Sequence, residues 1–161
     1  MKKNIYHPLP TLFLFLISSY SNLSLAHEKP GSLGNSRSGS VATDIYEMTC
    51  FDDGAGEPTK LMFQVIDKPP AKAPTLSIQA VKMDTGERSS ISTDPKDGDK
   101  NYSPLVSFAP TGGGSGAYLV TVTKSQTAPI VKGIELYQIQ YHCYTATNNH
   151  TGTERIMTQN Q

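Results

Sequence analysis

The sequence predicts an all-β protein, a single antiparallel β-sandwich of about seven or eight strands. Three observations lead to this fold class. Apolar and polar residues alternate in several segments, which is the period of a half-buried strand. All 13 glycines and nine of the 11 prolines lie within residues 27–161, where they recur between those segments as turn formers do. No segment carries apolar residues at helical spacing over three turns.

Residues 1–26 have the pattern of a secretory signal peptide. Lys2 and Lys3 precede an apolar stretch, Leu9–Ile17, and small residues stand at positions −3 and −1 of a cut before His27. The stretch is much shorter than the roughly 20 residues that span a bilayer. We therefore expect an exported protein, periplasmic or extracellular, without a membrane span.

The remainder divides into a flexible N-terminal tether, residues 27–40, and one β-sandwich domain, residues 41–161. The tether is rich in Gly and Ser and contains a single Leu. Of the 14 basic and 14 acidic residues only Lys2 and Lys3 fall in the leader, so residues 27–161 carry a formal charge of −2. A charge this small argues against a protein that binds nucleic acid by neutralising many phosphates.

The first four expected strands are Asp44–Phe51, Lys60–Asp67, Thr75–Met83 and a short edge strand, Arg88–Ser92, around Ile91. Loops and turns rich in Asp, Gly and Pro separate them at residues 52–58, 68–74 and 84–87. Every second residue of the three longer strands is apolar and faces one side: Tyr46, Met48 and Cys50; Leu61, Phe63 and Val65; Leu76, Ile78 and Ala80.

Four more strands are expected at Leu105–Phe108, Ala117–Lys124, Gly133–Tyr144 and Thr153–Thr158. A glycine-rich turn at residues 111–115 and a hairpin loop at residues 148–152 separate members of this set. The faces expected to be buried are Tyr118, Val120 and Val122, and then Tyr137, Ile139, Tyr141 and Cys143.

The two cysteines, Cys50 and Cys143, are expected to form a disulfide. Cysteines of exported proteins normally pair, and these two lie 93 positions apart. Only 24 of the 135 residues after the leader are Val, Ile, Leu or Phe, so the core is small. A cross-link over a loop of this length contributes about 4–5 kcal/mol in the chain-entropy model.

Two short segments resemble immunoglobulin-like domains. Tyr141-His142-Cys143 has the Tyr-x-Cys spacing of the tyrosine corner, and Gly116–Val122 is similar to a strand of bacterial immunoglobulin-like or fibronectin-like modules. The chain departs from the family in having no Trp and a longer cysteine spacing. The resemblance implies an immunoglobulin-like or fibronectin-like architecture and carries no function.

The histidines suggest a copper site. Cleavage before His27 would give this residue a free α-amine beside its imidazole, a chelating pair that some exported copper proteins use together with a second His. His142 or His150 is the expected partner. Three features argue against the site. His27 lies on the tether, His142 shares a strand face with glutamines, where we expect it to be exposed, and no Met or further Cys cluster accompanies the histidines.

An acidic loop gives a second metal hypothesis. Asp94, Asp97 and Asp99 surround Gly98, and carboxylates near a Gly turn suit Ca²⁺. Lys96 stands where the common calcium motif has Asp or Asn, and a solvated turn is the ordinary alternative.

No Gly-x-Ser-x-Gly occurs and short loops leave little material for a cleft, so we expect no enzymatic activity and no other cofactor. The expected function is that of a non-catalytic binding or accessory module. It would meet a protein or carbohydrate partner, whose identity the sequence leaves unknown, through loops such as residues 52–58, 93–102 and 111–115. The alternative is a metal-binding protein, with copper at His27 or calcium at Asp94–Asp99.

Overall fold

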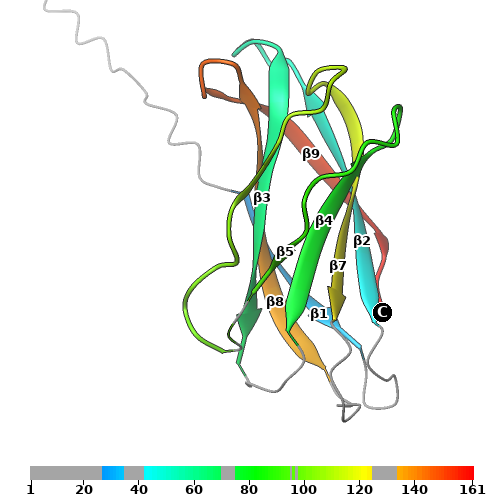
Figure 1. Cartoon of the computed structure of the whole chain (residues 1–161), viewed down its shortest axis with the longest axis vertical. Coiled ribbons are helices and arrows are strands. Elements are labelled where there is room, and N and C mark those ends of the chain that lie inside the picture. The colour runs from blue at the N-terminus through cyan, green and yellow to red at the C-terminus, as the bar shows by residue number, and fades with distance from the viewer. Residues whose placement is uncertain (1–26, 35–41, 70–74, 95, 97, 125–133) are drawn as a thin grey trace, which may run out of the picture.

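The computed structural model describes residues 27–34, 42–69, 75–94, 96, 98–124 and 134–161, and the predicted leader lies outside this part. Nine strands form a nearly closed barrel in which every pairing is antiparallel (Figure 1). The strands are β1 (His27–Leu33), β2 (Thr43–Phe51), β3 (Pro58–Lys68), β4 (Leu76–Lys82), β5 (Ser92–Thr93), β6 (Val106–Phe108), β7 (Gly116–Lys124), β8 (Glu135–Thr145) and β9 (His150–Gln159). Across the described residues, no helix is long and apolar enough to cross a membrane.

The strands follow the order β5-β4-β7-β2-β9-β8-β3-β6, and β1 pairs with β8 off this path. Two hydrogen bonds tie the two ends of the sheet together. The Ser92 hydroxyl donates to the Pro104 carbonyl at 2.5 Å, and the Asp67 amide donates to Asp94 Oδ2 at 2.7 Å. These bonds protect edges that would otherwise be open to pairing.

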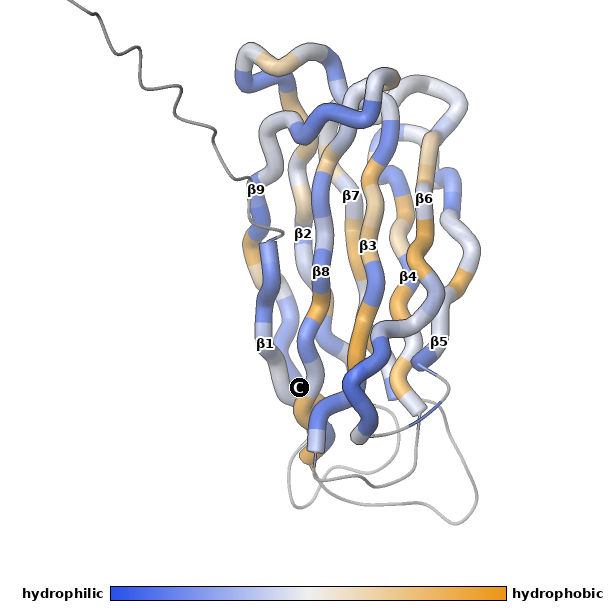
Figure 2. Tube along the Cα trace, turned by 90° about the vertical axis from the view of Figure 1, so that its left-hand side faces the viewer, coloured by the Kyte–Doolittle hydropathy of each residue, from blue (hydrophilic) through white to orange (hydrophobic). Residues whose placement is uncertain are grey.

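The core fills the inside of the barrel. All the residues expected on the buried faces of the five long strands are at most 5% exposed. Figure 2 shows short hydrophobic stretches separated by hydrophilic residues along β3. The prediction of an all-β, antiparallel fold is therefore confirmed, with nine strands in one continuous sheet in place of seven or eight.

Strand β9 crosses from one side of the barrel to the other. It begins beside β8, where Thr151 pairs with Cys143, and from Gly152 onward it pairs with β2. A Cβ atom at Gly152 would lie 2.5 Å from the Phe51 ring, so the crossing needs a glycine. The predicted disulfide joins Cys50 of β2 to Cys143 of β8 at this crossing, with a Cα–Cα distance of 5.6 Å.

Strand β1 occupies the edge of β8 that β9 leaves. It pairs with β8 from His27 opposite Tyr141 to Leu33 opposite Glu135, and Leu33 is fully buried. The prediction of a flexible tether over residues 27–40 is therefore wrong for His27–Leu33; residues 35–40 lie outside the described part. The strand has one apolar side chain other than Pro30, that of Leu33, and no alternation, so its pairing comes from the vacant edge of β8.

A buried hydrogen-bond cluster fastens β1 and β8 to β2. Tyr137 of β8 donates to Asp44 Oδ2 at 2.5 Å, and its hydroxyl lies 2.5 Å from that of Tyr46. Burial, with the adjacent Asp44 carboxylate second, raises the pKa of Tyr137 far above its ordinary value. The ring of Tyr137 covers Gly31, where a Cβ atom would lie 2.2 Å from the ring carbon that bears the hydroxyl.

The edge strand predicted at Arg88–Ser92 is largely wrong. Only Ser92 belongs to β5, while Arg88 makes a single bridge to Val81. Ile91, on which the prediction rested, is 63% exposed.

Removing the disulfide tests its contribution to stability. We expect the paired replacement Cys50→Ala with Cys143→Ala to lower the free energy of unfolding by about 4 kcal/mol, because the unfolded chain regains the freedom of a long loop. Urea denaturation measures the change, and chemical reduction of the unaltered protein serves as control. A loss below about 1 kcal/mol in both experiments would contradict the role assigned to the bond.

Gly31→Ala tests the packing between β1 and Tyr137. The added methyl group must displace a buried ring and its bond to Asp44, so we expect a loss of about 1–3 kcal/mol. Gly112→Ala is the matched control, since its Cβ would have only Thr85 Cγ2 nearby, at 3.8 Å. Equal unfolding free energies for the two variants would show that the close approach is unimportant.

Candidate functional site

Three histidines meet on the outer side of β8. The ring centroids of His142 and His150 are 4.2 Å apart, and those of His27 and His142 are 5.0 Å apart. The backbone nitrogen of His27 donates a hydrogen bond to Nε2 of His142 at 2.7 Å. The residues of the copper hypothesis, which are 115 and eight positions apart in the chain, thus form one cluster, called here the histidine cluster.

The strand register brings these residues together. His27 begins β1 opposite Tyr141, next to His142 in β8. His150 begins β9 opposite Tyr144, two positions further along β8. The cluster therefore lies where β8 exchanges one neighbour for the other.

A row of polar side chains holds the start of β1 in place. Glu28 accepts hydrogen bonds from Gln140 Nε2 at 2.8 Å and from the Tyr102 hydroxyl at 3.3 Å. Gln140 in turn accepts from Gln64 of β3, and Gln138 donates to the Tyr102 hydroxyl at 2.7 Å. The residue next to His27 is thus bonded to β8 and to Tyr102 of the segment before β6, which reduces the entropy lost when His27 binds a ligand.

His142 is only 6% exposed, so the prediction of an exposed residue is wrong. The face was assigned correctly, but His27, His150 and Tyr144 stand around the ring. Burial, then the neighbouring His150 and His27, lowers the pKa of His142 to about 4. Burial also lowers the pKa of His150, with His27 as the second cause. Both rings are therefore neutral at pH 7, the form that binds metals.

A hollow of about 130 Å³ adjoins the histidine cluster. Its lining is Met62, Gln64, Leu105, Gln140, Tyr141, His142 and Tyr144. Met62 of β3 is the direct cross-strand partner of His142. Sequence reasoning missed this methionine because only the register of β3 against β8 places it beside the histidines.

The side chains alone do not make a finished metal site. Over the described residues, no group of three or more His, Cys, Asp or Glu is arranged to hold a metal ion. The distinctive feature of the histidine cluster is the contact between a chain nitrogen, that of His27, and an imidazole nitrogen of His142.

The residues of the calcium hypothesis have other roles where the structure describes them. Asp94 is 1% exposed, and its carboxylate accepts hydrogen bonds from the amides of Asp67 and Lys96. Asp99 accepts from both nitrogens of Asn101, which lowers the pKa of its carboxyl. Asp97 lies outside the described residues. Asp94 and Asp99 thus act as acceptors that shape the loop.

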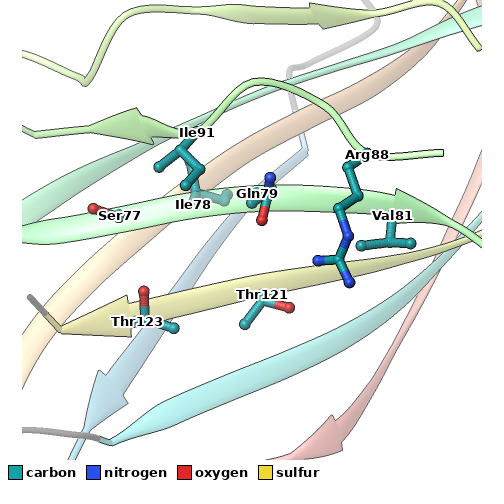
Figure 3. Close-up of a pocket in the computed structure, with 8 residues that line it drawn as sticks. All are labelled: Ser77, Ile78, Gln79, Val81, Arg88, Ile91, Thr121 and Thr123. Atoms are coloured by element: carbon teal, nitrogen blue, oxygen red, sulfur yellow. The ribbon is translucent and has the colours of Figure 1, made fainter. Parts of the chain in front are cut away.

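A second hollow, of about 330 Å³, lies on the outer face of β4 and β7 (Figure 3). Ser77, Gln79, Thr121 and Thr123 stand on these strands, and the Arg88 side chain reaches across β4 toward β7. The lining offers hydroxyls, an amide and one cation, but no His, Cys, Asp or Glu. These groups can bind a ligand, yet they supply neither a metal ligand set nor an acid–base pair.

Buried charges form a further feature that the sequence did not indicate. Lys124 of β7 and Glu135 of β8 have almost fully buried side chains, 3.9 Å apart, and Asp67 is fully buried as well. Burial lowers the pKa of Lys124, and the acids Glu135 and Asp67 oppose the shift. All three residues lie near the ends of strands, where the alternation of apolar and polar residues does not predict burial.

Comparison with protein-family models, with curated proteins and with solved structures finds no match to the chain.

The low pKa of His142 is testable by NMR. We expect its ring proton resonance to titrate near pH 4, whereas an unfolded histidine titrates near pH 6.5. Because the folded pKa is the lower one, the stability that neutral His142 contributes is complete above pH 6.5 and declines as the pH falls toward 4. His142→Gln should reduce this decline in urea denaturation between pH 7 and pH 5. A resonance that titrates at pH 6 or above would contradict the burial of the ring.

Proposed function

We propose that the protein is an exported copper-binding protein whose mature chain begins at His27. The observation that carries the proposal is the 2.7 Å contact between the His27 nitrogen and His142 Nε2. In the uncleaved chain that nitrogen is an amide. Removal of residues 1–26 would turn it into an α-amine, which binds Cu(II) when it has lost its proton.

The distance between the two nitrogens suits a shared metal ion. Bonds from a metal ion to imidazole are about 2.0 Å long, so two neighbouring ligands in a square-planar site lie about 2.8 Å apart. The His27 nitrogen and His142 Nε2 already have nearly this separation. The His27 imidazole completes a chelate with its own amine, and His150 offers a further imidazole 4.2 Å, ring to ring, from His142.

Cu(II) is the metal this donor set favours. Imidazole and amine nitrogens in a planar arrangement are typical of Cu(II), and Cu(II) binds such sites more tightly than other divalent ions of its row. The neutral state of His142 leaves its Nε2 lone pair available at physiological pH. The role is non-catalytic copper binding, and the Cys50–Cys143 bond is consistent with the export that the role requires.

The other functional predictions have less support. Asp52 and Asp53 of the loop at residues 52–58 accept hydrogen bonds from amides of the same loop, as ordinary turn residues do. A protein or carbohydrate partner that binds the loops stays a prediction. Calcium binding at Asp94–Asp99 also stays a prediction, without an observation that favours it.

We further propose that the barrel is a variant of the immunoglobulin-like sandwich. Strands β4, β7 and β2 are neighbours, as are β3 and β8, and the disulfide joins β2 to β8. Immunoglobulin domains have this arrangement in their two sheets, with the disulfide between them. The departures are β9, which moves from β8 to β2, and β1, which pairs with β8 in its place.

Titration of a chain that starts at His27 with Cu(II), measured by calorimetry, tests the proposed function. We expect tight binding of one ion, and weaker binding by at least about tenfold after His27→Ala or His142→Gln. The sharpest control is the same chain with its His27 α-amine acetylated, which keeps every side chain but returns the chain nitrogen to an amide and adds no new amine.

The same titration with the acetylated chain decides the outcome. Loss of tight binding on acetylation supports the α-amine ligand, whereas equal binding by both chains contradicts it. Micromolar or weaker binding that His27→Ala leaves unchanged would reject the copper site altogether. Zn(II) should bind the chain that starts at His27 more weakly than Cu(II).

A further inference from the structure

A methionine lies beside the proposed copper site. Met62 pairs directly with His142 across β3 and β8, so the two side chains project from the same face of the sheet. Directly opposite residues have Cβ atoms about 5 Å apart. Both side chains line the 130 Å³ hollow that adjoins the histidine cluster. Because β3 adjoins β8 on the edge opposite β1, the Met62 sulfur can approach a metal ion held by His142 from the side away from His27.

A thioether sulfur, such as that of Met62, binds the two oxidation states of copper differently. Thioether sulfur is a soft donor that favours Cu(I), whereas nitrogen ligands in a plane favour Cu(II). Methionine has three rotatable bonds, so its sulfur can move to or from a metal without a change in the backbone. Leu105 and the ring of Tyr144 line the same hollow, beside the polar side chains of Gln64 and Gln140.

We propose that the site holds copper in both oxidation states and that Met62 is a ligand of Cu(I) alone. This inference rests on the proposed function. Cu(II) is bound by the α-amine and imidazoles, and Cu(I) by imidazole nitrogen together with the Met62 sulfur. Copper reduced by one electron from a small reductant such as ascorbate would thus remain on the protein.

The structure also supplies a matched control among the methionines. Met83 follows the end of β4 and is 50% exposed, and it is absent from the lining of the hollow. Met48 lies in the core, and Met157 packs against the core. Among the described methionines, Met62 is the one that lines the hollow beside His142.

The test measures Cu(I) and Cu(II) affinities of Met62→Leu in the chain that starts at His27. Cu(I) is supplied with ascorbate and measured by competition with bicinchoninate, and Cu(II) is measured by calorimetry. We expect Cu(I) affinity to fall at least about tenfold, which is 1.4 kcal/mol, while Cu(II) affinity changes by less than about threefold. Met83→Leu should change neither affinity.

The outcomes separate the two proposals. If the unaltered chain fails to bind Cu(II) tightly, the proposed function fails and this inference fails with it. If Cu(II) binds but Met62→Leu leaves Cu(I) affinity unchanged, or lowers both affinities equally, only the role of Met62 is overturned. X-ray absorption of the unaltered protein gives a reading independent of any variant: a sulfur neighbour is expected for Cu(I) and none for Cu(II). Absence of sulfur around Cu(I) would overturn the inference.

Discussion

Along one edge of β8 the neighbouring strand changes from β1 to β9. The rest of the structure depends on where this change occurs. Cys143 and Tyr144 pair with β9, while Tyr141 and the residues before it pair with β1. The Cys50–Cys143 disulfide fixes the place where β9 departs for β2. Because β9 leaves, an edge of β8 becomes free, and the N-terminal strand fills it. Without this exchange, β1 would not pair with β8, and His27 would not lie beside His142.

The sequence predicts the barrel core better than it predicts the site. Core positions depend on the alternation within each strand, so the buried faces of β2, β3, β4, β7 and β8 follow from the sequence. The disulfide follows from the cysteine count together with the export that the sequence predicts. The site depends on which strands are neighbours and in which register, and register is a property of pairs of strands. No single segment carries that information.

Three particular residues illustrate this difference. His142 was assigned to the correct face, but its exposure depends on rings contributed by β1 and β9. Gly31 reads as a flexible residue in the sequence, whereas in the barrel it gives room for the Tyr137 ring. Met62 is an ordinary outward strand residue until β3 is aligned with β8. Gly31 and Met62 each acquire a role from a partner more than 70 positions away, and His142 from His27, 115 positions away, together with the nearby His150.

We propose that the chain nitrogen of His27 and Nε2 of His142 bind one copper ion together. A crystal structure of the Cu(II)-loaded chain that begins at His27 would show the ligands. We expect one copper ion bound by the α-amine and imidazole of His27 and by His142 Nε2, with β1 still paired to β8. Copper bound elsewhere, or an α-amine that has moved away from His142, would contradict it.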